Sequence, residues 1–352
     1  METEKAPSLI LNIAMAFAAV GALAWVGTAP GPRPADALAK LSVPYRIERL
    51  DPRFDKLVPR DAKLETIVEG RAWVEGPVWR AETGSLLFSD IPQNAVFEWR
   101  PGEGARLFLA PSGYSGREPF AGREPGSNGL ALDAQGRLVL AEHGDRRITR
   151  LDSDGTRRVL VDRYLGKRLN SPNDLVFKSN GDLYFTDPPF GLPGTFADPA
   201  KELAFQGVYR LRADGTLTLL TSELKAPNGI AFSPDEKILY VTDVHPGTAT
   251  WRAYPVKADG TLGPGRVFAD ANRFRANGPG GPDGLKVDAA GNLFASGPGG
   301  IYVFAPDGTH LGSILTGKAT SNAAWGEDGS TLFITGGTEV FRIRLTTRGA
   351  GY

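Results

Sequence analysis

The feature that most constrains this chain is a short unit that recurs six times. Each unit opens with a polar residue, continues into an apolar run, turns at a short polar segment and returns as a second apolar run. The opening polar residues, which we call the openers, follow one another at intervals of 39 to 55 residues. They are Glu75, Asn128, Asn173, Asn228, Asp283 and Asn322.

The register inside the units is strict. The second apolar run begins ten positions beyond the opener in five units and eleven beyond it in the first. Asp-Gly turns between short apolar runs, as at 214–215 and 307–308, indicate further hairpins between the units. Six repeats of about four antiparallel strands predict an all-β fold, a six-bladed β-propeller over residues 61–348. A β-sandwich would not explain six openers in one register.

The two ends of the repeat region are expected to pair. Residues 64–68 precede the first opener and read as a strand without a partner in their own unit. Placed beside residues 339–344, they would supply the outer strand of the last blade. That pairing would close the ring and remove an exposed sheet edge.

The N-terminus differs from the repeats. Leu9–Gly27 is almost wholly apolar and long enough to span a bilayer as a helix. We expect residues 1–30 to form an uncleaved anchor or a cleaved signal peptide, with a buried helix as a further alternative, and residues 31–60 to be a linker. Either membrane interpretation predicts export, to a periplasmic, membrane-anchored or secreted location, with membrane contact through residues 9–27 if the segment is retained.

Composition excludes several classes of function. The 40 basic and 40 acidic residues balance, which gives no reason to expect a nucleic-acid partner. The chain has no Cys, so disulfides, thiolate metal sites and a Cys nucleophile are excluded. The sequence also lacks a phosphate-binding P-loop and the Gly-x-Ser-x-Gly elbow of serine hydrolases.

The openers are candidates for a common metal site. In a propeller the innermost strand of each blade lines the central channel, so residues just before it meet at one mouth. All six openers carry oxygen donors, and a hard divalent cation binds carboxylates, amide carbonyls and water. The alternative is that each Asn-Gly or Asp-Gly pair is only a turn, which explains Glu75 poorly because Glu is not a turn former.

A second set of residues is expected at the same mouth, where the second strand of each blade ends. It comprises Asp90, Glu142, His143, Asp187 and Asp243. His143 can exchange protons near neutral pH, so it is a candidate base, although a His that caps a strand end is an equal alternative. The strand-end Asp residues can likewise be turn caps.

Four motifs carry a resemblance to a known family. Glu75-Gly-Pro-Val-Trp, Ser171-Pro-Asn-Asp, Pro227-Asn-Gly and Pro282-Asp-Gly-Leu occur in order, and the chain resembles the gluconolactonase/regucalcin (senescence marker protein 30) family of six-bladed propellers. The run 185–191 is similar to the bacterial gluconolactonase branch. The resemblance covers about residues 64–344 and implies a metal-dependent lactonase, a hydrolase that opens a sugar lactone.

The resemblance also implies roles for single residues. Glu75, Asn173, Asn228 and Asp283 match the family's metal-binding positions, and the ion is usually Ca²⁺, although Zn²⁺, Mn²⁺ or Mg²⁺ could serve. Asp283 also matches the position proposed as general base. In the expected reaction the metal polarises the lactone carbonyl, water attacks, and Asp283 or His143 takes the proton. The resemblance implies substrate contact for Asn128 and His143, and we expect Asp187 and Asn322 to contact the substrate as well because of their places at the channel mouth.

Two alternative functions stay open at this stage. The same metal site could hydrolyse organophosphates or non-sugar lactones, which an apolar channel mouth would favour. The propeller could instead be a non-catalytic, membrane-tethered binding module, although such a scaffold does not need six oxygen-bearing openers. The long loop 111–126 is a candidate lid, with Tyr114, Arg117 and Arg123 able to reach sugar hydroxyls, or else a surface loop.

Overall fold

The computed structural model describes residues 45–352, and these residues fold as one unit. The apolar stretch Leu9–Gly27, and with it the predicted N-terminal hydrophobic helix and anchor or signal segment, lies outside the described residues. Within residues 45–352, we find no helix with the length and apolarity needed to cross a bilayer.

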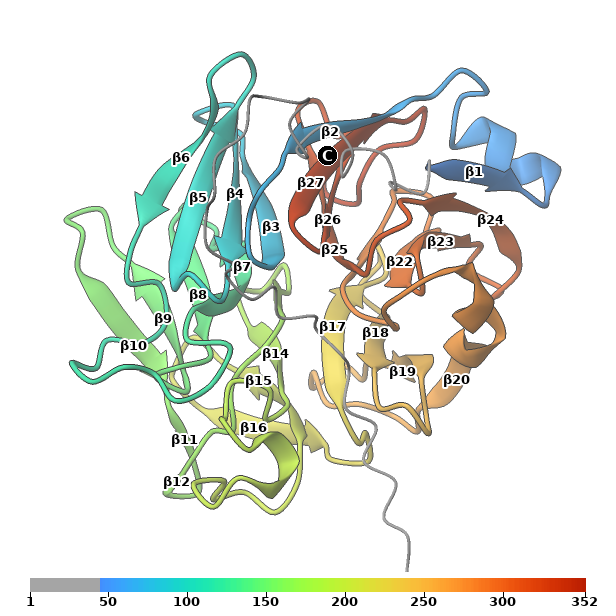
Figure 1. Ribbon diagram of the computed structural model, residues 1–352. Coiled ribbons are helices and arrows are strands. Elements are labelled where there is room, and N and C mark those ends of the chain that lie inside the picture. The colour runs from blue at the N-terminus through green and yellow to red at the C-terminus, as the bar shows by residue number, and fades with distance from the viewer. Residues whose placement is uncertain (1–44) are drawn as a thin grey trace, which may run out of the picture. The chain divides into compact units, whose positions relative to one another are not determined.

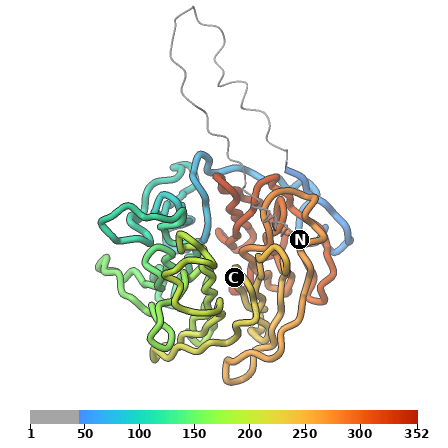
Figure 2. Tube along the Cα trace, turned by 60° about the horizontal axis from the view of Figure 1, so that its bottom comes forward, coloured from blue at the N-terminus to red at the C-terminus, as the bar shows by residue number. Residues whose placement is uncertain are grey.

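Six antiparallel sheets stand around a common axis (Figures 1 and 2), which confirms the predicted six-bladed β-propeller. The strands of each blade follow one another from the axis outward. Blade one contains β3 (Val74–Arg80), β4 (Ser85–Asp90), β5 (Ala95–Arg100) and β6 (Gly104–Leu109). Blade two contains β7 (Ser127–Leu132), β8 (Leu138–Glu142), β9 (Arg147–Leu151) and β10 (Arg157–Val161). Blade three contains β13 (Leu175–Phe177), β14 (Leu183–Asp187), β15 (Gly207–Leu211) and β16 (Leu217–Thr221).

The remaining blades follow the same plan, with additions at two outer edges. Blade four contains β17 (Pro227–Phe232), β18 (Ile238–Asp243), β19 (Thr250–Pro255) and β20 (Arg266–Asp270). Blade five contains β21 (Leu285–Val287), β22 (Leu293–Gly297), β23 (Gly300–Phe304), β24 (His310–Leu315) and the added β1 (Arg46–Arg49). Blade six contains β25 (Thr320–Gly326), β26 (Thr331–Gly336), β27 (Glu339–Arg344) and β2 (Leu64–Val68). Outside the blades lie β11 (Arg163–Tyr164), β12 (Lys167–Arg168) and the 3₁₀ helices η2 (Pro52–Lys56), η3 (Thr195–Ala197) and η4 (Ala271–Asn277).

The burial pattern explains why the apolar runs are continuous rather than alternating. Every residue of the second strands β4, β8, β14, β22 and β26 is buried, because each blade packs both of its faces against neighbouring blades. The outermost strands β6, β10 and β16 contain no buried residue. The core is therefore a set of inter-blade layers that surround the axis.

The ring is closed as the sequence predicts. β2 pairs antiparallel with β27, with Leu64 opposite Ile343 and Thr66 opposite Phe341. Glu65 Oε2 also accepts a hydrogen bond of 2.7 Å from Arg342 Nε across this pair. A strand from the start of the described chain thus completes the last blade and removes its free edge.

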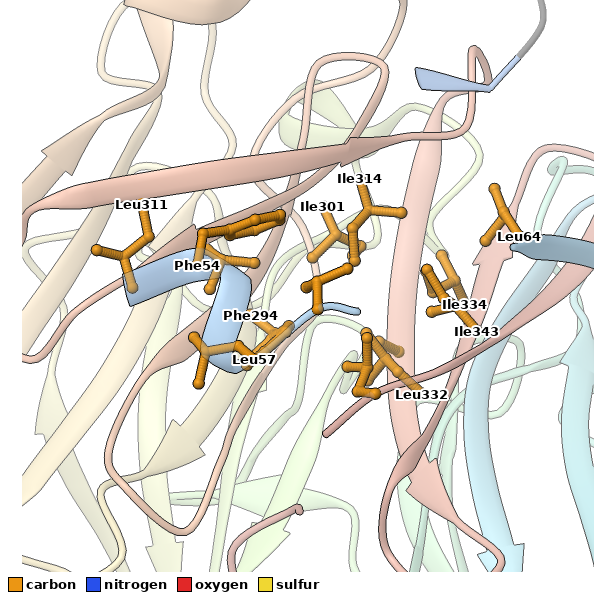
Figure 3. Packing of buried hydrophobic residues seen from close by; sticks show 14 of the residues in the cluster. Phe54, Leu57, Leu64, Phe294, Ile301, Leu311, Ile314, Leu332, Ile334 and Ile343 are labelled. Carbon is orange, nitrogen blue, oxygen red and sulfur yellow. The ribbon is translucent and has the colours of Figure 1, made fainter. Parts of the chain in front are cut away.

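The second half of the predicted linker is folded rather than extended. β1 pairs with the outer edge of β24, with Arg46 opposite Leu315, and η2 then places the fully buried Phe54 against Leu311 and Ile314 (Figure 3). Asp51 begins η2 by accepting a 2.8 Å hydrogen bond from Arg53 N. Residues 45–60 are therefore a strap that covers the edge of blade five.

Candidate metal and active site

The openers meet at one end of the propeller axis. The first strands of neighbouring blades contact one another around the axis, and the openers lie at the start of these strands. A cavity of about 270 Å³ is formed there. Its lining residues are Trp73, Glu75, Glu124, Asn128, Asn173, Phe190, Asn228, Val244 and Asp283. Five of the six openers therefore line one cavity.

A local break in the ladder of four of the six blades helps to turn their openers inward. The pairing of the first and second strands shifts register just after Glu75, and it shifts at the opener in blades two, four and six as well. An extra residue at such a bulge re-aims the side chains around it. The first strands can therefore supply donors to the axis without losing the ladder farther along.

The glycine that follows four of the openers allows neighbouring blades to approach closely. A β-carbon on Gly129 would lie 2.6 Å from the Asn173 carbonyl oxygen, and one on Gly229 would lie 2.2 Å from the Asp283 carbonyl oxygen. Both distances are far shorter than a real contact. The Asn-Gly and Asp-Gly pairs, which read as turns in the sequence, are thus places where two backbones touch.

Hydroxyl groups tie several blades to the next one near the openers. Ser89 Oγ, on the second strand of blade one, donates a 2.9 Å hydrogen bond to the Asn128 carbonyl oxygen in blade two. Thr186 Oγ1 donates in the same way to the Asn228 carbonyl oxygen at 2.7 Å. Ser321 Oγ closes the circle with a 2.7 Å bond to the Val74 carbonyl oxygen. These bonds fix the backbone that carries the donors.

Two carboxylates that are far apart in the sequence, Glu75 and Asp283, line the same cavity and repel each other. Glu75 is 2% exposed, and its Oε2 atom accepts a 2.7 Å hydrogen bond from Gly76 N. Burial raises the pKa of Glu75, and repulsion from Asp174 acts in the same direction. Burial also raises the pKa of Asp283 well above its usual range, with repulsion from Glu75 and Asp174 added. The site therefore favours a positive charge between these groups.

Unpartnered oxygens show that the donor set fits a cation. Within the described part of the chain, Asn128 Oδ1, Asn173 Oδ1 and Asp283 Oδ1 are buried and have no hydrogen-bond partner. Buried acceptors are normally satisfied, so three unsatisfied ones around one cavity indicate a binding site for a ligand that these oxygens can contact. Among residues 45–352 no three His, Cys, Asp or Glu side chains gather as a metal site. The donors present here are instead carboxylates and amides, which suit a hard cation.

Asp174 and Asn322 lie beneath this cavity rather than in its lining. Asp174 Oδ1 accepts a 2.9 Å hydrogen bond from Leu175 N, and its Oδ2 atom lies 3.4 Å from Asn322 Nδ2. Asn322 Oδ1 accepts a 3.1 Å hydrogen bond from Lys286 Nζ. Asp174 thus bonds to the backbone of its own turn. Asn322, predicted as a substrate contact, has its amide engaged below the cavity.

The strand-end carboxylates hold the segments that lead to the openers. Asp187, a predicted substrate contact, is fully buried and accepts hydrogen bonds from Asn170 N at 2.8 Å and Ser171 N at 2.9 Å. Burial raises the pKa of Asp187 to about 7. Asp90 and Asp243 accept backbone N–H groups in the same way. Asp187 therefore stabilises the backbone of this segment. Its two carboxylate oxygens accept these hydrogen bonds, and the residue is not part of the cavity lining.

Glu124 is part of the cavity wall, and His143 lies behind Glu124. His143 is fully buried and is absent from the lining, whereas Glu124 is part of the lining and its side chain is 30% exposed. His143 Nδ1 is 2.8 Å from Glu124 Oε2, although the direction is not that of a hydrogen bond. Sequence reasoning missed Glu124, which belongs to no repeated pattern and lies in the loop that precedes the second opener.

Two of the larger hollows elsewhere on the propeller have a different lining. They measure about 530 Å³ and 570 Å³ and are lined largely by charged side chains, among them Arg342 with Glu65 and Arg210 with Asp182. Neither includes an opener. The cavity at the openers is smaller, but it alone among these three combines buried carboxylates with unpartnered amide oxygens.

Comparison with known proteins agrees with this geometry. The family described as the SMP-30/Gluconolactonase/LRE-like region matches residues 73–338. A gluconolactonase from Zymomonas mobilis is 42% identical over 312 residues, which are 86% of this chain and 87% of the relative. The solved structure of a gluconolactonase from Xanthomonas campestris is 37% identical with a TM-score of 0.74, over 87% of this chain and 99% of that one.

A more distant structure shows the same fold. It is described as a calcium-binding protein, regucalcin, from Agrobacterium tumefaciens, and it is 20% identical with a TM-score of 0.62 over 88% of this chain and 96% of that one. The matched residues 73–338 contain all six openers and the whole candidate site. This chain belongs to the SMP-30/gluconolactonase family of β-propellers.

Proposed function

We propose that the protein hydrolyses a sugar lactone at the cavity formed by the openers, with a divalent cation as cofactor. The observation that carries this proposal is the convergence of two buried carboxylates and several amide oxygens on one cavity, three of those oxygens without a partner. The names of the Zymomonas and Xanthomonas relatives support the same substrate class.

Glu75, Asn173, Asn228 and Asp283 are the residues that would hold the cation. All four line the cavity. Calcium is the first choice because carboxylate and amide oxygens are its preferred ligands, and Zn²⁺, Mn²⁺ or Mg²⁺ are the alternatives to be compared. When bound, such an ion supplies a Lewis acid that withdraws charge from the lactone carbonyl.

The walls of the cavity suit a polyhydroxylated ring. Asn128 Oδ1 is buried and free to accept a hydrogen bond from a sugar hydroxyl. Trp73 and Phe190 provide apolar surface against which the C–H face of a sugar can pack. Six of the nine lining residues are polar, so the mouth is mixed rather than apolar. This balance favours a sugar lactone over an organophosphate.

The experiment uses the purified full-length chain and glucono-δ-lactone at slightly acidic pH, where spontaneous ring opening is slow. Hydrolysis should stop with a chelator and return when Ca²⁺ is added in excess. Glu75→Gln and Asp283→Asn should each lower kcat/KM at least about 100-fold, because each removes a charged donor. The exposed Glu82→Gln is the matched control and should behave as wild type.

Three results would contradict the proposal in different ways. Activity that survives chelation would show that the reaction needs no metal. Full activity in both variants would show that the reaction does not take place at this site. Absence of lactone hydrolysis together with phosphotriester hydrolysis would transfer the same site to the alternative substrate class.

A further inference from the structure

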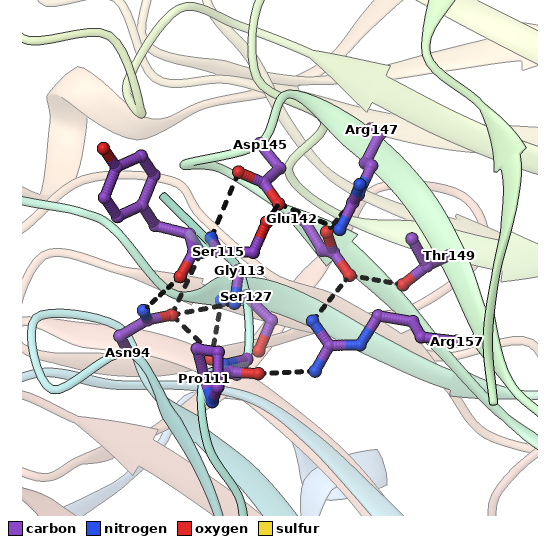
Figure 4. Close-up of polar contacts among 12 residues, drawn as sticks. Asn94, Pro111, Gly113, Ser115, Ser127, Glu142, Asp145, Arg147, Thr149 and Arg157 are labelled. Atoms are coloured by element: carbon purple, nitrogen blue, oxygen red, sulfur yellow. Dashed lines mark hydrogen bonds and ion pairs between the residues drawn. The ribbon is translucent and has the colours of Figure 1, made fainter. Parts of the chain in front are cut away.

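The loop 111–126 is held firmly at its beginning by one side chain (Figure 4). Asn94 Oδ1 accepts hydrogen bonds from three successive backbone N–H groups, those of Ser112, Gly113 and Tyr114, at 2.8–3.1 Å. Asn94 Nδ2 donates back to the Tyr114 carbonyl oxygen at 2.8 Å. Ser115 Oγ, next along the loop, donates a 2.6 Å hydrogen bond to Asp145 Oδ2. The first part of the loop is therefore fixed to blades one and two.

The end of the loop is fixed equally well. Gly126 N donates a 3.0 Å hydrogen bond to the Ile91 carbonyl oxygen, and Gly126 O accepts one of 3.1 Å from His143 N. Ser127 N donates to Ser112 Oγ at 3.0 Å, which brings the two ends of the loop together. A compact loop with adjoining ends holds its residues in defined positions. Glu124, two residues before Gly126, is thereby placed at the cavity.

His143 is closely packed by the chain on two sides. A β-carbon on Gly191 would lie 2.5 Å from His143 Cβ, so the loop of blade three is packed directly on the His side chain. A β-carbon on Gly144 would lie 2.5 Å from the Pro125 carbonyl oxygen, so the Glu124 loop is packed directly on the residue after His143. The imidazole is thus enclosed, with its Nδ1 atom 2.8 Å from Glu124 Oε2.

We propose that Glu124 is the catalytic base of the lactonase reaction and that His143 is its positioning residue. This inference rests on the proposed lactonase function and deepens it. Glu124 is the carboxylate of the cavity wall that is not among the four metal donors. Asp283 is a weak base if it holds the cation, and His143 is shut off from the cavity by Glu124 itself.

The proton and electron balance of the step is complete without a further reactant. A water molecule in the cavity attacks the lactone carbonyl carbon, a C–O bond forms, and one water proton moves to the Glu124 carboxylate. The ring C–O bond then breaks, and its electron pair remains on the ring oxygen. Glu124 returns the proton to that oxygen, which yields the open-chain hydroxy acid and restores the base.

The charged groups that face Glu124 are consistent with this assignment. His143 is its neighbour at 2.8 Å, and Glu124 is close enough to Asp283 to contribute to the raised pKa of that carboxyl. A cation bound at the openers would offset the repulsion between the two carboxylates. A base beside the donors, rather than among them, keeps its lone pair for the proton.

The test compares Glu124→Gln with Glu118→Gln, an exposed residue on the same loop. Glu124→Gln should lower kcat for glucono-δ-lactone at least about 100-fold with KM within about threefold, as expected for loss of a general base. The kcat/KM of Glu124→Gln should also rise less steeply with pH than that of the wild type. The thermal stabilisation by Ca²⁺ should stay at the wild-type value, because the donors are intact. Glu118→Gln should match the wild type in all three measurements.

The part of His143 is tested with two substitutions. Asn places an amide where Nδ1 lies, so His143→Asn should keep most of kcat and the wild-type pH profile. His143→Leu removes the polar atom and should lower kcat about tenfold with KM unchanged, a loss of the size expected when a supporting group is removed. If Leu and Asn have equal effects, His143 acts only by filling space and its positioning role is wrong.

The outcomes separate this inference from the function on which it rests. A wild-type protein with no lactonase activity under any cation refutes both. An active wild type with kcat of Glu124→Gln within about threefold refutes the base alone. A rise in KM with kcat unchanged also refutes it and leaves Glu124 as a ligand for a sugar hydroxyl.

Discussion

A β-carbon on Gly76 would lie 2.1 Å from the carbonyl oxygen of Asn128, the opener of the next blade. A β-carbon on Gly129 or Gly229 would likewise meet the backbone of the next blade, and one on Gly284 would meet the Asn322 side chain. Only Gly76 among these four also has a positive φ, of 53°. The donors can surround a single small cavity because these four glycines let their strands touch.

Gly76→Ala should therefore be severely destabilising. The methyl group meets backbone rather than a flexible side chain, so we expect a loss of at least about 3 kcal/mol in the free energy of unfolding and loss of Ca²⁺ binding. Gly84 is the matched control, because it has a similar φ of 59° with open space around it. Gly84→Ala should cost about 1 kcal/mol. Urea denaturation and calorimetric titration measure both, and equal losses would contradict the steric argument.

Thr186→Val tests the hydroxyl groups that join the blades. Thr186 is fully buried, donates to the Asn228 carbonyl oxygen at 2.7 Å and accepts from Asp174 N at 3.1 Å. Valine has nearly the same shape but leaves two buried groups without partners, so we expect about 3 kcal/mol of destabilisation. Thr66→Val, on the exposed side of β2, should stay within about 0.5 kcal/mol. A matching loss at both sites in chemical denaturation would show that the hydroxyl bond contributes little.

Asp187 should make stability depend on pH below neutrality. Its pKa is raised to about 7 by burial. A carboxyl group with a raised pKa in the folded state contributes fully below its unfolded pKa, and that contribution is lost as pH rises through the folded value. The free energy of unfolding should therefore fall between about pH 4 and pH 7, and less steeply in Asp187→Asn.

The control for this pH series is Asp214→Asn at an exposed turn. The pKa of Asp214 is lowered by its hydrogen bonds with Thr216, so its contribution changes only at lower pH. Its variant should follow the wild-type slope over the measured range. Denaturation curves for the three proteins at a series of pH values make the comparison. A wild-type slope in Asp187→Asn would show that this carboxyl does not carry the effect.

Phe54→Ala should weaken the strap that covers blade five. The ring is fully buried against Leu311 and Ile314, and large-to-small changes at such sites cost about 3 to 5 kcal/mol. Leu50→Ala is the control, because Leu50 is 62% exposed and should change stability by less than about 0.5 kcal/mol. Thermal denaturation of both variants decides the point. A small effect at Phe54 would mean that the strap is dispensable for the propeller.

The fold could be predicted because the same pattern of an opener and two apolar runs occurs six times in the sequence. Six openers in one register specify six first strands, and the unpaired strand at 64–68 specifies how the ring closes. β1 could not be found in the same way, because its four residues pair only with the edge of β24 and repeat nothing. Its Pro-rich surroundings read as linker, although tertiary pairing overrides that local preference.

The site could be predicted only where it follows the repeat. Five openers line the cavity, as expected from their common position. Asp174 occupies a place where four blades have Gly, which was a visible signal that its side chain has a particular role. Glu124 gave no such signal, because a loop residue acquires its position from bonds that the sequence does not display. Asp187 looked like a site residue because the strand end is near the mouth, yet its oxygens are used by the backbone.

The closure of blade six has a consequence for synthesis of the protein. Glu65 and Arg342 bond across the last blade although they are 277 positions apart in the chain. A nascent chain that has already produced Glu75, Asn173, Asn228 and Asp283 still lacks β25, β26 and β27, so its donors have no complete ring to hold them together. Loops of this length make such contacts slow to form. Binding of the proposed cation should thus be a late event that follows completion of the whole chain, rather than a nucleus around which the blades gather.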